Sequence, residues 1–393
     1  MNNKTLTLAI AAALATPMAT HAEVKLSGTI QAEAVSWKAA DGNDNAEVHR
    51  GTTNFEDDHD RQTLTNDAAG AVFNEGPNGI QFDIEEKLGG GLKASARYAA
   101  GFNTSGNSGL DGTAEAFVGL GTQSFSIRYG TLVGAYKSSV ELIDPWSFTS
   151  LQASGTAGGM TGETSNQVNK VGSKYIVNTA EKSKGGGMGL TNEGFVEGAL
   201  DIGLKFGGFE GRLQGVVDDT SDMDGAGLIE LKYAIPNTFA VWLAAAYTDL
   251  DDVKSTVSTT TGGTSTSDEG LVNWKIGGRY QLGSMLKFGL QYEDAEIGTF
   301  DGDINPDGGK YIMGSLDLTM SNITLAGWVA GYLSDIEDSQ KIDSMDEDAL
   351  SWALGAKYHF SKRTQIYAGY RLTDSDNDYR DENVITMGIR HTF

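Results

Sequence analysis

Cysteine is absent from the 393-residue chain, and proline occurs only five times. The chain has 29 basic residues but 53 acidic ones. The absence of cysteine excludes disulfide frameworks, thiolate metal sites and cysteine nucleophiles. The net charge of −24 excludes a nucleic-acid-binding protein, which needs a basic surface. The hydrophobic fraction of 39% is low for soluble domains of this total length, so we do not expect one large apolar core.

The first 22 residues have the pattern of a secretory signal peptide. Lys4 supplies a positive charge, residues 6–15 are apolar apart from one threonine, and small residues surround a cleavage point after Ala22. We therefore expect residues 1–22 to be removed and residues 23–393 to form the exported protein. No later stretch approaches the roughly 18 consecutive apolar residues of a transmembrane helix. The product should be soluble, secreted or an outer-membrane β-barrel, because only helices and closed barrels satisfy their backbone groups in lipid.

From Val24 onward, apolar residues recur at every second position in segments of about ten residues. A period of two is typical of β-strands, and about ten residues cross a bilayer when the strand is tilted by about 45°. In residues 383–393, for example, Ile385 and Met387 share one face, whereas Arg390 lies on the other. One face of each strand is therefore apolar and the other polar, as lipid outside a barrel and water inside it require.

Short and long connections alternate along the chain. Seven short connections suit tight turns. The eight long connections are residues 38–77, 103–111, 134–193, 219–224, 249–270, 294–309, 335–347 and 375–382. Together they join 16 strands, an even number that leaves both termini on the short-turn, periplasmic side. The prediction is an all-β fold, a 16-stranded antiparallel transmembrane β-barrel with short periplasmic turns and long extracellular loops.

The order of several short motifs resembles the general diffusion porins of Gram-negative bacteria. Residues 79–94 are similar to the family's first hairpin, and residues 116–130 resemble the hairpin that leads into its pore-constricting loop. Residues 384–393 are similar to the family's last strand, whose terminal phenylalanine, here Phe393, is read by the barrel assembly machinery. The resemblance implies a homotrimeric channel in the outer membrane of a Gram-negative bacterium, surrounded by lipid and lipopolysaccharide.

The resemblance also implies that the third long loop, residues 134–193, folds into the channel and narrows it. The acidic and aromatic residues that resemble the family's constricting segment are Glu141, Asp144, Trp146 and Phe148. The family places arginines on the opposing wall, but two corresponding positions hold Gly79 and Ala114 in this chain.

Residues 168–178 look strand-like, but counting them as a spanning strand would make 17 and break the even number. We therefore assign them to the third loop or to an extension of the following strand. They contain Lys170 and Lys174, which resemble the basic residues that follow the constricting loop in the family.

Basic residues at alternating strand positions are candidates for the wall of the bore. They are Lys25, Lys93, Arg97, Arg128, Lys205, Arg212, Lys232, Arg279, Lys287, Arg371 and Arg390. On a soluble β-sandwich the same residues would form a solvated face, but sandwiches rarely need strands of such regular length over a chain this long. A water-filled bore lined with charges explains the pattern, and a 16-stranded barrel is wide enough to leave one.

One acidic loop, residues 301–308, could hold a hard cation. Its oxygen-bearing side chains stand at every second position, as Asp301, Asp303, Asn305 and Asp307. This spacing suits Ca²⁺, which takes six to eight oxygen ligands. However, Pro306 stands where an EF-hand loop has its sharp-turn glycine, and the distal glutamate is missing. A plain solvated loop is the alternative.

Enzymatic activity finds little support. The four histidines after residue 22 occur singly, and the H-E-x-x-H and G-x-S-x-G motifs are missing. We therefore expect no enzyme and no cofactor, apart from possible calcium at the extracellular loops. The predicted function is passive diffusion of small hydrophilic solutes and ions through an outer-membrane porin. The alternatives are a substrate-selective outer-membrane channel and a secreted acidic calcium-binding β-protein or adhesin.

The acidic excess lies in six of the eight long loops, all except 103–111 and 134–193. These six hold 32 acidic and 6 basic residues, whereas the rest of the exported chain holds 21 acidic and 22 basic residues. The negative charge is therefore expected at the extracellular mouth, where it concentrates cations. Its field is screened over about 8 Å at physiological ionic strength, so we predict a mild cation preference that weakens as salt rises.

Overall fold

The computed structural model describes residues 22–39, 60–65, 78–102, 110–136, 143–153, 169–171, 174–177, 195–217, 227–248, 271–296, 298–300, 304–305, 308–334, 348–375 and 382–393. Every regular element within these ranges is a β-strand. No helix among these residues is both long enough and apolar enough to cross a membrane.

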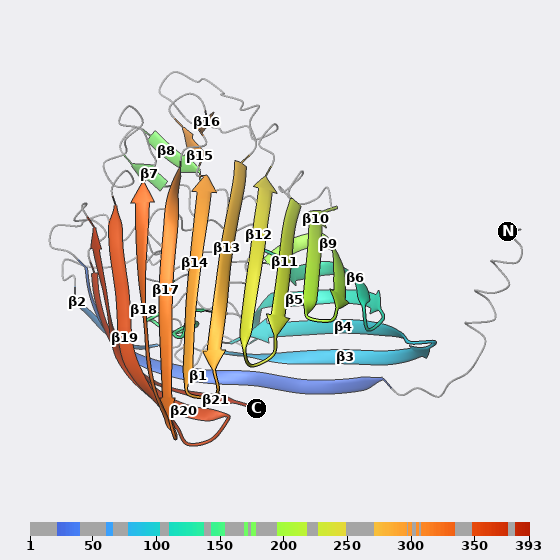
Figure 1. Ribbon diagram of the computed structural model, residues 1–393, viewed down its shortest axis with the longest axis horizontal. Helices are drawn as coiled ribbons and strands as arrows, with labels where there is room; N and C mark the ends of the chain where they lie inside the picture. The colour runs from blue at the N-terminus through green and yellow to red at the C-terminus, as the bar shows by residue number, and fades with distance from the viewer. Residues whose placement is uncertain are drawn as a thin grey trace, which may run out of the picture.

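Sixteen long antiparallel strands form a barrel (Figure 1). They are β1 (Glu23–Ala39), β3 (Gly79–Gly89), β4 (Leu92–Gly101), β5 (Asp111–Gly121), β6 (Phe125–Val133), β9 (Phe195–Phe206), β10 (Phe209–Val216), β11 (Gly227–Ile235), β12 (Phe239–Thr248), β13 (Leu271–Leu282), β14 (Leu286–Glu296), β17 (Gly308–Met320), β18 (Ile323–Ser334), β19 (Ala349–His359), β20 (Thr364–Ser375) and β21 (Glu382–Thr392). Strand β1 pairs with both β3 and β21, so the sheet closes on itself. The predicted 16-stranded antiparallel barrel is confirmed.

The seven predicted short connections are the turns that close the hairpins. In the β9–β10 turn, Gly207 has a φ of 60°, a left-handed conformation that glycine adopts without steric cost. In the β11–β12 turn the corresponding position is Asn237, with a φ of 57°; asparagine is among the few other residues that tolerate it. The turn residues in the sequence therefore have the backbone conformations that tight hairpins need.

Outward-facing side chains are apolar and exposed, whereas inward-facing ones are mostly polar. On the outside, Leu204 is 60% exposed and Met387 is 62% exposed. On the inside, Asp201, Gln214 and Arg371 are buried. The exposed apolar side chains form the surface that lipid covers in a membrane barrel.

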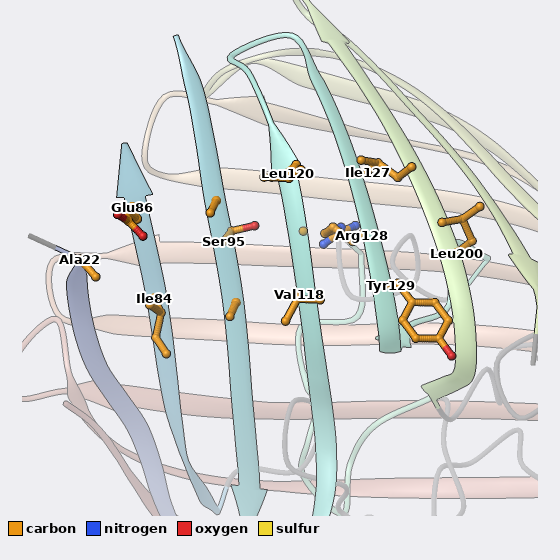
Figure 2. A pocket seen from close by; sticks show the side chains of 13 residues that line it. Ala22, Ile84, Glu86, Ser95, Val118, Leu120, Ile127, Arg128, Tyr129 and Leu200 are labelled. Carbon is orange, nitrogen blue, oxygen red and sulfur yellow. The ribbon is translucent and has the colours of Figure 1, made fainter. Parts of the chain in front are cut away.

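The outer surface carries a hollow of about 540 Å³ over β3–β6 and β9 (Figure 2). Ala94 and Ala96 on β4 line its floor with short side chains, and longer ones such as Ile84, Val118 and Leu200 come from the neighbouring strands. Most of the lining side chains are on the apolar outer face of the sheet, so the hollow lies on the outside of the barrel.

Two smaller pairings were not predicted. Strand β2 (Asp60–Thr65), from the first long loop, pairs with residues 33–38 of β1, whereas β3 pairs with residues 23–29 of the same strand. Strand β2 of the first loop therefore extends the sheet along β1 beyond Gly79, the first residue of β3.

A separate four-stranded sheet joins two long loops. It contains β7 (Asn169–Val171), β8 (Lys174–Val177), β15 (Gly298–Phe300) and β16 (Ile304–Asn305). In Figure 1 this sheet lies beyond the upper ends of β14 and β17. Strand β8 pairs with β15 and not with β9. The strand-like part of residues 168–178 therefore belongs to the third loop and is not an extension of the following strand.

Candidate functional site

The segment 143–153 of the third loop packs against the inner wall of the barrel. Trp146 and Leu151 are fully buried, and Ile143 is 5% exposed. Together with inward-facing wall residues, among them Trp328, these three side chains form one apolar cluster. This part of the loop therefore lies inside the bore, held by apolar contacts to the β12–β20 side of the wall.

Three inward-facing glycines make room for the loop. A Cβ atom on Gly289 would lie 2.6 Å from Cβ of Ile143, one on Gly355 would lie 2.7 Å from Cζ2 of Trp146, and one on Gly369 would lie 2.5 Å from Cδ1 of Leu151. Real Cβ atoms do not approach other heavy atoms this closely. We call these three residues the glycine seat. Because they lack side chains, the apolar side chains of the loop lie directly on the backbone of the wall.

Wall side chains also bind the backbone carbonyls of the loop. Lys357 donates to the carbonyl of Pro145, Arg390 to those of Ser147 at 3.2 Å and Phe148 at 3.0 Å, Trp328 to that of Leu151 at 2.8 Å, and Arg371 to that of Gln152 at 3.3 Å. The Lys357 ammonium also lies 4.6 Å from the centroid of the Trp146 ring, a cation–π contact. Basic residues of β19, β20 and β21 thus hold the loop.

Glu33 on β1 accepts one hydrogen bond from the loop segment and one from the wall. Its carboxylate lies 3.1 Å from the backbone nitrogen of Ser150 and 2.6 Å from the hydroxyl of Tyr367, and the Glu33 side chain is fully buried. Charge-assisted hydrogen bonds of this kind are about twice as strong as neutral ones. The wall therefore binds both the N–H and the C=O groups of the loop.

Asp144 is buried within the loop and does not face the bore. Its carboxylate accepts hydrogen bonds of 2.8 Å from the backbone nitrogens of Trp146 and Ala153, and only 5% of its surface is exposed. Burial raises the pKa of the carboxyl to about 6; the two backbone hydrogen bonds and the charge of Lys357 oppose this shift. Asp144 therefore joins the two ends of the segment.

Phe148 adopts a strained backbone conformation at the turn of the segment. Its φ is 67°, in the left-handed region that bulky residues rarely enter. Its N–H donates to the side chain of Gln152 at 2.8 Å, and its carbonyl accepts from Gln31 at 2.8 Å and from Arg390. Hydrogen bonds from three sides thus hold this conformation.

The opposite wall, from β3 to β11, carries a belt of ion pairs. They are Lys93–Glu85 at 2.8 Å, Arg97–Asp83 at 2.8 Å, Arg97–Glu115 at 2.6 Å, Arg128–Asp201 at 2.6 Å, Arg212–Asp201 at 3.0 Å, Lys205–Glu210 at 2.5 Å and Lys232–Glu210 at 2.6 Å. We call this set the charged belt. It brings together six of the predicted pore-wall residues, Lys93, Arg97, Arg128, Lys205, Arg212 and Lys232.

Arginines cover the acids in the centre of the belt. The side chains of Arg97 and Arg128 are 30% and 25% exposed, whereas those of Glu115 and Asp201 are 4% and 0% exposed. The ring of Phe117 lies between the two guanidinium groups, 5.7 Å and 5.2 Å from their carbon atoms. The guanidinium groups therefore face the water of the bore, and the carboxylates neutralise them from behind.

The other predicted wall residues lie elsewhere. Arg371 is fully buried beneath the third loop, so it lines the seat of the loop and not the open bore. Arg279 is partly exposed on β13, and Lys25 is exposed near the start of β1. Phe393 pairs its N–H and C=O with Gly28 of β1, at 3.0 Å and 3.2 Å, and so completes the closure of the barrel.

Several predicted residues fall outside the part of the chain that is described. Glu141, Asp301, Asp303 and Asp307 lie there, and Asn305 is placed by its backbone only, in β16. Gly79 starts β3, and Ala114 lies within β5. Lys170 and Lys174 belong to β7 and β8.

Sequence reasoning missed Glu33, Lys357, Tyr367 and the glycine seat. The alternation of each strand shows which glycines face inward, so this signal was available in the sequence. What marks the seat is that Gly355 and Gly369 are directly opposite each other in the β19–β20 register. That pairing depends on knowing the register, which the sequence alone did not supply.

Comparison with known families decides what this barrel is. A family model described as Gram-negative porin matches residues 8–378. The chain belongs to the Gram-negative porins. This porin is therefore a channel of the outer membrane for passive diffusion, which confirms the predicted family, location and class of function.

Solved structures support the fold of this porin at low sequence identity. It resembles the anion-selective porin from Comamonas acidovorans with a TM-score of 0.64 and 16% identity, over 95% of this chain and 100% of that one. It resembles the outer-membrane channel DcaP of Acinetobacter baumannii with a TM-score of 0.57 and 12% identity, over 95% and 97%. The trimer form of OmpT from Vibrio cholerae gives a TM-score of 0.57 and 12% identity, over 95% and 99%. Comparison with curated proteins found no relative of this porin.

Proposed function

We propose that this porin is a general diffusion channel for small hydrophilic solutes and ions, with a mild preference for cations and no catalytic activity. The observation that carries the proposal is the distribution of charge. The charged belt holds six basic residues and five carboxylates in ion pairs, whereas the six acidic loops hold 32 acidic and 6 basic residues. Selectivity by charge therefore arises mainly at the mouth.

The belt favours a non-specific bore. Every basic residue in it lies within 3.0 Å of a carboxylate oxygen, so its charge is largely compensated before a solute arrives. A site that selects one solute needs polar groups left free to bind it. A paired belt instead gives a polar surface along which many solutes can diffuse.

Swelling of proteoliposomes tests the absence of solute specificity. We expect the rate to fall smoothly with solute size across neutral sugars and zwitterionic amino acids. Saturable block of single-channel current by one solute, with no block by solutes of similar size, would instead support the substrate-selective channel.

We also propose that the functional unit is a homotrimer in lipid that contains lipopolysaccharide. The exposed apolar outer face supports a membrane setting, and the Vibrio cholerae relative is described in a trimer form. Sedimentation of the detergent-solubilised protein, and a heat-sensitive band on a gel, should report three copies. A monomer in both experiments would contradict the trimer.

Processing and calcium binding are further parts of the proposal. We expect the outer-membrane form to begin at Glu23, after removal of residues 1–22, which amino-terminal sequencing can read directly. Calcium would bridge the acidic mouth loops, including residues 301–308. Calorimetric titration of the purified porin with Ca²⁺ should detect binding that the variant Asp301→Asn/Asp303→Asn weakens; equal binding by both forms would exclude this loop as the site.

A further inference from the structure

Basic residues gather in the halves of the strands that are nearer the short turns. This end of the barrel is formed by the six residues of each long strand that are nearest its short turn or, in β1 and β21, nearest the chain terminus. These positions carry 12 basic and 7 acidic residues. The long loops at the opposite end of the barrel carry the acidic excess. The two ends of the channel therefore differ in the sign of their charge.

Most of these basic residues already have partners. Six belong to the charged belt, and Lys357 and Arg390 bind carbonyls of the third loop. Of the remaining four basic residues, Lys25 and Lys87 are exposed, and within the described part of the chain the side chains of Arg279 and Lys287 form no hydrogen bond and no ion pair. Arg279 and Lys287 lie on the neighbouring strands β13 and β14, and both are partly exposed. The Nε atom of Arg279 is buried without an acceptor.

These two residues lie close together on the inner wall. In the β13–β14 register, Arg279 is opposite Gly289 and Lys287 is opposite Gln281, so the two basic residues are diagonal neighbours. Residues two apart on one strand share a face, so both point to the same side as Gly289, which contacts the third loop. We call Arg279 and Lys287 the basic step. Among the described residues in register with the basic step, Asp317 of β17 is the acidic one, directly opposite Lys287.

We propose that the basic step and the acidic mouth make this channel a rectifier, which passes more current when the extracellular side is positive. The inference rests on the acidic mouth of the proposed function. Beyond the proposed function, the inference places a second charged zone, of opposite sign, near the periplasmic end of the channel. This zone consists of Arg279 and Lys287.

The direction follows from which ions enter at each end. With the extracellular side positive, cations enter through the acidic mouth and anions enter past the basic step, so each ion arrives at the end that concentrates it. With the polarity reversed, each ion arrives at the end that repels it, and the bore is depleted of carriers. The effect depends on fields that reach across the bore. It should therefore disappear near 1 M salt, where the screening length is about 3 Å.

The experiment is a current–voltage curve of single channels in planar bilayers with the same KCl concentration on both sides. The orientation of the channel in the bilayer can be determined with a single introduced cysteine, because the chain has no cysteine of its own. In the variant Ser258→Cys, within the long loop 249–270, a bulky thiol reagent that cannot cross the membrane modifies the channel only from the extracellular chamber. We expect a ratio of currents at opposite voltages of about 1.5 in dilute salt, and of about 1 in 1 M salt.

Three variants separate the basic step from other charges. Arg279→Gln/Lys287→Gln should bring the ratio in dilute salt close to 1. Asp317→Asn removes the acid beside the step and should raise the ratio, so the test does not rely on one variant folding. Lys362→Gln/Arg363→Gln removes the same number of charges from the exposed β19–β20 turn, outside the bore, and should leave the ratio unchanged.

Symmetric currents in dilute salt, or larger currents with the extracellular side negative, would overturn the proposal. The proposal would also be overturned if Arg279→Gln/Lys287→Gln and Lys362→Gln/Arg363→Gln lowered the current ratio by the same amount, because the effect would then not depend on the basic step. The zero-current potential under a salt gradient is measured on the same channels. Cation preference together with symmetric currents would reject rectification and leave the proposed function standing, whereas anion preference would contradict the proposed function itself.

Discussion

The guanidinium of Arg390, on the last strand, donates a hydrogen bond of 3.0 Å to the carbonyl oxygen of Phe148 in the third loop. This contact joins residues 242 positions apart in the sequence, and it shows that a basic residue on the inner wall need not face the solute. Arg371 and Lys357 are used in the same way. The electrostatics of the bore therefore depend on which basic residues the loop covers.

Asp144 should be required for the third loop to keep its position. In Asp144→Ala, two buried N–H groups lose their acceptor, which costs about 1–3 kcal/mol for each. We expect the segment 143–153 to leave its seat more often and the mean single-channel conductance to rise. Asp374→Ala is a matched control, because Asp374 is exposed on β20. Equal conductance of the two variants would show that Asp144 does not hold the loop.

The seating of the loop should weaken as pH rises from 5 to 7. In the seated loop burial raises the pKa of Asp144 to about 6, from an ordinary value of 3.8. A seated loop thus binds this proton more tightly than an unseated one. The resulting stabilisation is complete below pH 3.8 and is lost as pH rises through about 6; a shift of this size corresponds to about 3 kcal/mol.

Open-channel noise reports this equilibrium, because an unseated loop moves in the bore. We expect quieter channels at pH 5 than at pH 7, and we expect Asp144→Asn, which cannot ionise, to remove most of the difference. A wild-type channel whose noise is constant over this range would mean that Asp144 does not titrate with the position of the loop.

The glycine seat should be intolerant of side chains. In Gly289→Val the new side chain would occupy the space of Ile143, which lies 2.6 Å from an ideal Cβ at this position. We expect the loop to be displaced and the conductance to rise, while the barrel keeps its resistance to heat. Gly314→Ala is the control, because the nearest atom to a Cβ there is 4.0 Å away. If Gly289→Val conducts like the control, Ile143 is not packed on that position.

The barrel could be predicted from the sequence, whereas the seat of the loop could not. Alternation in strands such as residues 383–393 reports which face meets lipid, and turn residues such as Asn237 mark the hairpins, so strand number and polarity are local information. The partners of Asp144 are different. Its two N–H donors belong to its own loop, but the sequence does not show how that loop folds. The same residues could place the Asp144 carboxylate either inside the loop or in the open bore.

The basic residues of the wall show the same limit. Alternation predicts Arg128 and Arg212 on the inner face, and in the structure both pair with the buried Asp201. Alternation could not tell them from Arg371, which the loop covers. That difference depends on contacts between residues far apart in the sequence, such as Gln152 and Arg371, which no periodic pattern encodes.

Phe393 should matter for assembly beyond the contacts it makes. Its backbone forms two hydrogen bonds with Gly28, and these survive in Phe393→Ala but not in a variant that lacks residue 393. If the side chain is read by the assembly machinery, both variants should lower the folded outer-membrane population sharply. If only closure of the barrel matters, Phe393→Ala should assemble normally. Quantifying the heat-modifiable band in isolated outer membranes distinguishes the two cases.

The zero-current potential across a planar bilayer under a KCl gradient tests the role of the acidic mouth most directly. The mouth loops carry a balance of −26, whereas the charged belt is nearly compensated. We expect the sign of a cation-preferring channel in dilute salt, and a smaller potential when both solutions are raised toward 1 M, where the screening length falls to about 3 Å. A potential of the opposite sign in dilute salt would show that the arginines of the bore outweigh the mouth, and it would contradict this account.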